Sequence, residues 1–171
     1  MGIIRDRNFN KTKLKTKKLS TAEIEIAVAN FLNYRVNLIV PNIWWGLNFC
    51  YELDLISVSK AGYATEVEIK VSLSDLKKNK LKKEWAHCDK RIKYLFFAIP
   101  DYLYDKAVEH IPENAGILTV NQNLKVDIKK VAKQNKALKL TQKEILKLQH
   151  LSAMRIWALK KKIIKFKKKE V

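Results

Sequence analysis

The stretch that decides the fold is residues 51–71, YELDLISVSKAGYATEVEIKV. Apolar and polar residues alternate through residues 51–59 and again through residues 63–71, a spacing that predicts two β-strands. Gly62 lies in the short connection between them and supplies the backbone freedom that a tight turn requires. We therefore expect two antiparallel strands joined in a hairpin.

This hairpin carries four acidic side chains. Because residues two apart share one face of a strand, Glu52 should lie beside Asp54 on the first strand. On the second strand Glu66, Glu68 and Lys70 share a face in the same way. Carboxylates this close repel one another unless a cation neutralises them, and Mg²⁺ prefers such oxygen ligands. A Glu-x-Glu-x-Lys pattern alone is also typical of an ordinary half-exposed sheet face.

The rest of the chain predicts a layered α/β arrangement around this hairpin. Ser20 and Glu23 have the spacing of a capping box, which opens a helix that continues to about residue 33. Pro41 interrupts an apolar run and indicates an edge, a bulge or a bend. Further elements are expected as a basic helix at 74–90, a buried strand at 94–99, a helix at 102–110, a strand at 116–120 and an edge strand at 124–128.

Composition favours one folded domain with a polyanionic partner. The 171 residues include 35 Lys+Arg against 17 Asp+Glu, for a formal net charge of +18, and 47% are hydrophobic. This apolar content excludes a disordered basic tail, and the positive charge favours nucleic acid. Two cysteines and three histidines form neither a disulfide framework nor a zinc pattern. With no apolar run long enough to span a membrane, we expect a cytoplasmic protein.

Charge also divides the chain into segments. Residues 1–18 are predicted to form a basic flexible arm, residues 19–128 the α/β domain, and residues 129–171 a Lys-rich helical extension. Acidic residues gather in the domain, whereas residues 125–171 hold 16 basic and 3 acidic side chains. A second capping box, at Thr141 and Glu144, opens a helix that is expected to run to about residue 166.

These elements resemble a known superfamily. Asp54 on one strand, Glu68-Ile69-Lys70 on the next and Glu23 on the preceding helix resemble the PD-(D/E)XK, or restriction-endonuclease-like, nucleases. Leu53 stands where the motif's name has proline. The resemblance implies an α/β fold with a restriction-endonuclease-like core, a mixed central sheet flanked by helices, to which this chain adds its basic helical C-terminal extension.

A longer stretch is similar to one family in particular. Residues 68–75, Lys80, Trp85, the pair Cys88-Asp89 and residues 94–98 resemble the MmcB family of DNA-repair-associated proteins. This resemblance covers about residues 20–120.

The resemblance implies a Mg²⁺-dependent DNA endonuclease that acts in DNA repair, recombination or mobile-element processing. Asp54, Glu68 and the backbone carbonyl of Ile69 would hold Mg²⁺, for which Mn²⁺ is an expected substitute. Lys70 would position or activate the attacking water and stabilise the charge that develops on the phosphate. Glu23 is either the cap of its own helix or a fourth catalytic residue that faces the metal, with Glu25 as its substitute.

Basic side chains complete the expected DNA interface. We expect phosphate contacts from the basic helix and from the C-terminal helix, through Lys77, Lys78, Lys80, Lys82, Lys83, Lys160, Lys161 and Lys162. The alternative function is a non-catalytic DNA-binding subunit that retains the nuclease fold. The sequence leaves a homodimer open, and it leaves RNA open as a substrate.

Overall fold

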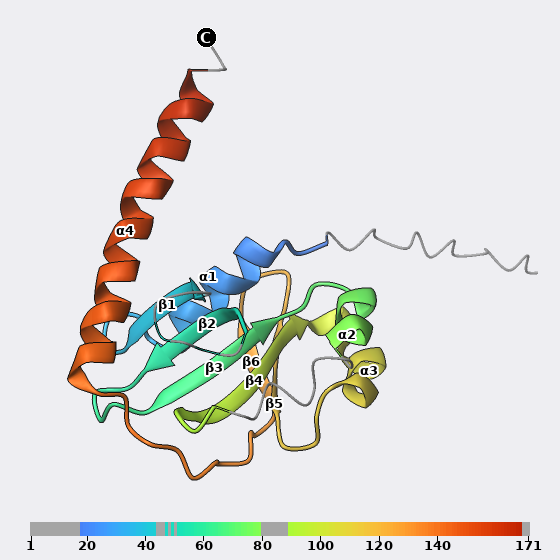
Figure 1. The fold of residues 1–171 in the computed structure, drawn as a ribbon. Coiled ribbons are helices and arrows are strands. Elements are labelled where there is room, and N and C mark those ends of the chain that lie inside the picture. Colours follow the sequence, from blue (N-terminus) through green and yellow to red (C-terminus); the bar gives the residue numbers. More distant parts are fainter. Residues whose placement is uncertain (1–17, 44–46, 48, 50, 80–88, 169–171) are drawn as a thin grey trace, which may run out of the picture.

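The computed structural model describes residues 18–43, 47, 49, 51–79 and 89–168. Residues 1–17 of the arm expected at residues 1–18 and the lysines Lys80, Lys82 and Lys83 lie outside these residues. A six-stranded sheet forms the centre, in the order β1-β2-β3-β4-β5-β6 (Figure 1). Its strands are β1 (Leu38–Ile43), β2 (Leu53–Val58), β3 (Ala64–Ile69), β4 (Ile92–Pro100), β5 (Gly116–Val120) and β6 (Val126–Lys130).

The strand directions make the sheet mixed, as the sequence predicts. Strands β1, β2 and β3 pair antiparallel, β3, β4 and β5 pair parallel, and β6 returns antiparallel to β5. The predicted hairpin is confirmed, because Leu55 faces Val67 and Val58 faces Ala64. Gly62 turns the chain between these strands with a φ of +85°. An L side chain rarely adopts this conformation.

Pro41 lies within strand β1 and does not end it. The strand continues through Pro41, from Leu38 to Ile43, and it is an edge of the sheet. A proline can occupy an edge because it has no N–H to donate. Asn42 follows with a φ of +51°, and this irregularity lies opposite the candidate site on β2.

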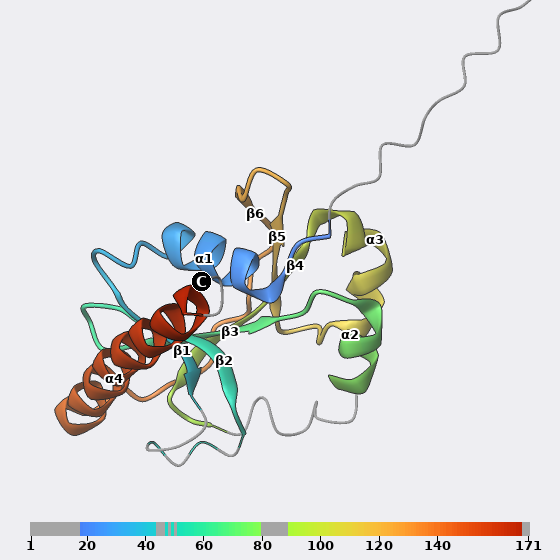
Figure 2. The same ribbon diagram turned by 90° about the horizontal axis from the view of Figure 1, so that it is seen from above.

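Helices cover both faces of the sheet (Figures 1 and 2). They are α1 (Thr21–Phe31), α2 (Leu73–Asn79), α3 (Tyr104–Ala107) and α4 (Gln142–Lys167). Both predicted capping boxes are formed, at Ser20 and at Thr141. The helix expected at 102–110 is three short turns, with 3₁₀ segments at Asp101–Leu103 and Val108–His110 on either side of α3.

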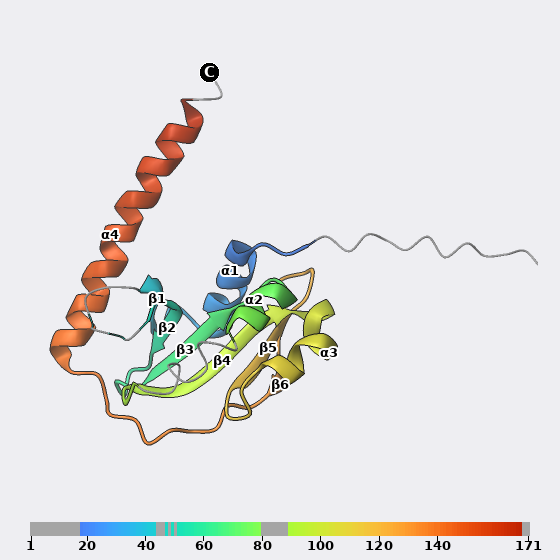
Figure 3. The ribbon, with the colours of Figure 1, turned by 45° about the vertical axis from the view of Figure 1, so that its right-hand side comes forward.

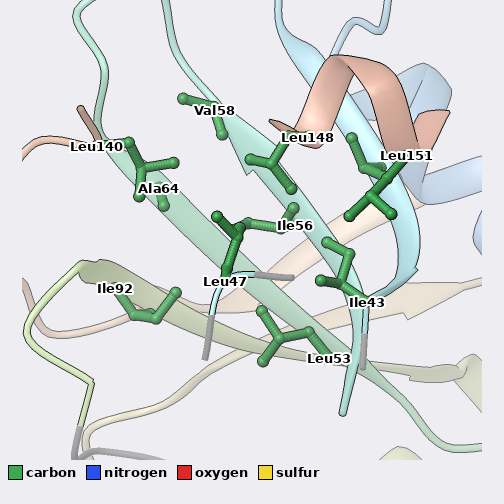
Figure 4. Packing of buried hydrophobic residues seen from close by; sticks show 11 residues of the cluster. Ile43, Leu47, Leu53, Ile56, Val58, Ala64, Ile92, Leu140, Leu148 and Leu151 are labelled. Atoms are coloured by element: carbon green, nitrogen blue, oxygen red, sulfur yellow. The ribbon is translucent and has the colours of Figure 1, made fainter. Parts of the chain in front are cut away.

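The core consists of packed clusters on the two faces. On one face Ile56 and Val58 of β2 pack against Leu148 and Leu151 of α4 (Figure 4). Farther along the sheet, a second cluster joins Leu76 of α2 to apolar residues of β4 and β5. On the opposite face α1 packs its buried residues against Leu55, Val67 and neighbouring strands. The acidic residues of β3 therefore lie on the face that α2 and α4 share.

The Lys-rich extension expected at residues 129–171 is not helical throughout. Residues 131–141 are neither helix nor strand, and several of their N–H groups donate to carbonyls at the rim of the sheet. Leu138 N donates to Lys90 O, and Leu140 N donates to Gly62 O. The side chain of Leu140 is buried in the same cluster as Leu148. This segment and the first turns of α4 are thus part of the domain's core.

The second half of α4 projects away from the sheet (Figure 3). Every residue from Ile156 to Lys168 is exposed. Among the described residues, no helix is both long enough and apolar enough to cross a bilayer.

Candidate active site

Asp54, Glu68 and Lys70 meet where β2 begins and β3 ends. The Lys70 Nζ lies 2.7 Å from the Glu68 Oε2 and 3.2 Å from the Asp54 Oδ2. Glu68 and Lys70 are mostly buried, and Asp54 is the most accessible, with 31% of its side chain exposed. The hairpin thus brings together the three residues that the sequence singled out, and leaves one carboxylate open to solvent.

Asp54 is placed by the end of the strand pairing. The β2–β3 ladder stops at the pair Leu55 and Val67, and the Asp54 carboxylate accepts the next N–H, from Ile69, at 2.8 Å. A side-chain oxygen therefore takes the role of a main-chain acceptor. This contact fixes the Asp54 carboxylate beside Lys70.

The strict alternation expected along β2 breaks at this point. Leu55 packs in the cluster under α1, whereas Leu53 packs with Ile56 in the cluster under α4. The β1–β2 register puts Asn42, with its positive φ, across from Asp54. The irregular pair lets both neighbours of Asp54 point into the core while its carboxylate reaches β3.

Glu66 lies deeper on the same face of β3. Its side chain is fully buried, and its Oε2 accepts a hydrogen bond from the Tyr51 hydroxyl at 2.8 Å. Its Oε1 is buried without a hydrogen-bond partner. Burial raises the pKa of Glu66 well above its usual value, and the charges of Glu68 and Asp54 add to this effect, although the bond from Tyr51 opposes it.

The pKa values of Glu68 and Lys70 are shifted by the same crowding of charges. Burial raises the pKa of Glu68, the Asp54 carboxylate adds to the rise, and Lys70 offsets part of it. Burial alone would lower the pKa of Lys70, but the carboxylates of Glu68 and Asp54 reverse this and raise it. Lys70 is therefore a fixed cation at neutral pH, suited to stabilising negative charge.

Glu52 does not join the cluster, contrary to the expectation of four grouped carboxylates. It precedes the first residue of β2 and is exposed. Its charge acts on Arg155 of α4. Because Glu52 lies before the strand begins, the two-residue spacing does not align it with Asp54.

The structure separates the two candidate acids of α1. Glu23 receives hydrogen bonds from both the backbone N–H and the hydroxyl of Ser20, each at 2.8 Å, and so completes the capping box. Glu25 is half-buried and accepts a hydrogen bond from the Asn42 side chain. Burial raises the pKa of Glu25, Asn42 and Arg155 lower it, and the nearby Asp54 raises it further. The charge of Glu25 thus interacts with that of Asp54.

The predicted DNA-binding lysines and the predicted metal ligand Ile69 lie on different elements of the fold. Lys77 and Lys78 are exposed on α2, which follows Lys70 directly, while Lys160, Lys161 and Lys162 are exposed on the projecting half of α4. The Ile69 side chain is buried on the opposite face of the sheet. Within the described part of the chain, no group of three or more His, Cys, Asp and Glu side chains is arranged to hold a metal ion.

Three residues next to the site were not found from the sequence. Tyr51 binds Glu66, Asn42 contacts Glu25, and Arg155 of α4 donates to the backbone carbonyl of Asn42. Only Asn42 carries a local signal, since asparagine after proline is typical of a turn with positive φ. Arg155 reaches the site across 113 positions of sequence, which no spacing rule covers.

Comparison with known proteins places this fold in a family. A family described as MmcB-like DNA repair proteins matches residues 13–163. The chain belongs to the MmcB-like family. The match to MmcB-like proteins includes Asp54, Glu68 and Lys70 as well as most of α4, and it associates the chain with DNA repair.

A solved structure shares the MmcB-like chain's fold. It is a protein of unknown function from Silicibacter pomeroyi, with 18% sequence identity and a TM-score of 0.64. The similarity covers 84% of this chain and 94% of that one. No curated protein matches the chain significantly.

Proposed function

We propose that this MmcB-like protein is a Mg²⁺-dependent DNA endonuclease that hydrolyses phosphodiester bonds. The observation that carries the proposal is the contact of Lys70 with both Asp54 and Glu68 at the end of the hairpin. Two acids and one lysine from adjacent strands are the combination that the PD-(D/E)XK resemblance implies. Membership of a DNA repair family supports DNA as the substrate.

The residues present fit a hard divalent cation. Their donor atoms are carboxylate oxygens, and Mg²⁺ needs only one or two carboxylates because water and phosphate complete its shell. Burial and the Asp54 carboxylate raise the pKa of Glu68, and Lys70 offsets only part of that rise, so a further cation is favourable here. Asp54 and Glu68 would hold the ion, and the Ile69 carbonyl stays a predicted third ligand. When bound, Mg²⁺ polarises the phosphate and lowers the pKa of water.

The protein's own groups have separate tasks in this reaction. Lys70, kept protonated by its two carboxylates, stabilises the charge that develops on the phosphate oxygens. Because its pKa is raised, Lys70 is a poor proton acceptor, so we assign it to electrostatic stabilisation and to positioning of water. Glu25 assists by holding Asn42, which lies across from Asp54. The deeper Glu66 supports the floor of the site through Tyr51.

A cleavage assay with the full chain tests the proposal. Single-stranded, duplex, nicked and branched DNA are incubated with Mg²⁺, with Mn²⁺ or with EDTA. We expect cleavage of at least one substrate that EDTA abolishes. Melting of the protein with and without Mn²⁺ gives a second readout, because metal bound to the folded state raises Tm. Binding of DNA without cleavage of any substrate would instead favour the non-catalytic subunit.

The two acids of α1 give a matched pair of variants. Glu25→Gln is expected to lower the cleavage rate at least about tenfold, equivalent to about 1.4 kcal/mol of activation free energy, because it alters the contact with Asn42. Glu23→Gln keeps an oxygen for the cap and should leave the rate unchanged. The rates are compared at equal protein and metal concentrations. A loss confined to Glu23→Gln would reverse the assignment.

The lysines of α2 are expected to bind DNA phosphates. Each phosphate contact contributes about −0.9 to the slope of log K against log salt concentration. Lys77→Ala/Lys78→Ala should therefore weaken DNA binding and reduce that slope by about 2. Titration of a fluorescent duplex at several salt concentrations measures the slope. The matched control is Lys125→Ala/Lys129→Ala, because these exposed lysines lie at the β6 edge of the sheet. An equal change in the control would contradict the α2 interface.

A further inference from the structure

The projecting half of α4 carries an apolar stripe that the domain does not cover. Ile156, Leu159, Ile163 and Phe166 are spaced by three, four and three residues, and each is more than half exposed. At about 100° per residue they span an arc of about 80° of the helix surface. A stripe this narrow, with a repeat of 3.5 residues, is typical of the seam of a coiled coil.

Basic residues border this stripe on both sides. If Ile156 and Ile163 occupy a positions, then Leu159 and Phe166 occupy d positions. The flanking e and g positions are then all basic: Arg155, Lys160, Lys162 and Lys167. Charges at e and g positions determine which helices pair.

The charge pattern selects the occupant of the stripe. A second copy of this helix would place basic side chains against basic side chains at the e and g positions, whether parallel or antiparallel. Duplex DNA would satisfy the lysines but would offer no apolar surface to cover Ile163 or Phe166. A bilayer would have to accept Lys160 and Lys167, which lie between the stripe and the second apolar strip at Trp157 and Ile164. In addition, Lys160 Nζ lies 4.9 Å from the Trp157 ring centroid, within this gap.

We infer that α4 is the docking site for an acidic helix of another protein, which pairs with residues 155–167 as a heterotypic coiled coil. The partner's a and d positions are apolar, and its e and g positions are Asp or Glu. Leu148 and Leu151 attach α4 to the domain, whereas all four residues of the stripe are exposed. This inference is independent of the proposed nuclease activity.

A peptide of defined charge tests the inference. The probe is a 21-residue peptide with Leu at a and d and Glu at e and g, and its control has Lys in place of each Glu. We expect the full-length protein to bind the acidic peptide with a Kd below about 100 µM and not to bind the basic one. Fluorescence anisotropy of the labelled peptides measures both.

Variants of exposed α4 residues locate the binding. Lys160→Glu/Lys162→Glu should weaken binding of the acidic peptide at least about tenfold, because both flanks then repel it. Lys147→Glu/Lys165→Glu makes the same change in net charge away from the stripe and should retain most of the affinity. Leu159→Asp/Ile163→Asp should also abolish binding. All three variants should melt like the wild type, since every altered residue is exposed.

Three results would overturn the inference. One is equal binding of the acidic and the basic peptide. Another is self-association of the wild-type chain that Leu159→Asp/Ile163→Asp removes in sedimentation. The third is binding of duplex DNA or anionic phosphatidylserine vesicles that depends on Lys160 and Lys162, while the acidic peptide does not bind.

Discussion

Asp54→Asn is expected to reduce metal-dependent DNA cleavage about 100- to 1,000-fold while leaving DNA binding in place, since loss of one preorganised electrostatic group costs about that factor. The asparagine keeps an oxygen that can accept the Ile69 N–H, so the end of the β2–β3 pairing is preserved. What is lost is the negative charge that would hold the metal. Lys70→Met should give a comparable loss, because it removes the fixed cation between the carboxylates.

The control is Glu52→Gln, which removes the same charge two residues away but outside the cluster. It should retain the wild-type cleavage rate. Mn²⁺ should no longer raise the Tm of Asp54→Asn. Cleavage by Asp54→Asn at the wild-type rate would show that Asp54 is not part of the active site.

Arg91→Met is expected to destabilise the fold by about 3 kcal/mol at pH 7, at the lower end of the cost of breaking a buried ion pair. The Arg91 guanidinium, at the start of β4, donates to Asp89, to the carbonyl of Leu47 and to Glu144 of α4. It also stacks 4.3 Å from the centroid of the Phe49 ring. Methionine fills a similar volume but leaves both carboxylates without their cation.

The pH dependence of this loss has a definite sign. Burial alone would raise the pKa of Asp89 and of Glu144, but Arg91 bonds to both and their pKa values are lowered in the fold. Stability gained in this way is present above the usual carboxylate pKa values, near 4, and disappears as the pH falls through the lowered values. The difference between Arg91→Met and the wild type should therefore shrink between pH 5 and about pH 3.

Urea unfolding at each pH measures this difference. The matched control is Lys133→Met, because Lys133 pairs with Glu113 at the surface, where both side chains are largely exposed. Its unfolding midpoint should stay at the wild-type value. If Arg91→Met also unfolded at the wild-type midpoint, the ion pairs of Arg91 with Asp89 and Glu144 would not contribute to holding α4 against the sheet.

The sequence predicted those parts of the fold that depend on local spacing. Strand alternation and Gly62 identified the hairpin, and the capping boxes identified the first residues of α1 and α4. The same spacing placed Glu68 beside Lys70, because both lie on one strand. Asp54 followed from the expectation that the two strands pair, which the register confirms up to its neighbour Leu55.

The remainder depends on contacts between distant segments. The alternation fails at Asp54 because Asn42, on another strand, adopts a positive φ across from it. Residues 131–141 have a helical composition but bind the rim of the sheet, so tertiary hydrogen bonds override their local preference. Glu23 and Glu25 differ only in what the folded chain places near them, and their sequence context does not reveal this.

The projecting α4 also has a mechanical consequence. It is 26 residues long, about 39 Å at 1.5 Å per residue, yet its last residue buried against the domain is Leu151. A force on the free end of a helix that is attached only at its other end produces a torque at the attachment. Arg155 lies near the attachment of α4 and contacts the backbone of Asn42, across from Asp54. A torque applied to the far end of α4 is therefore delivered to the strand that positions the site's most accessible carboxylate.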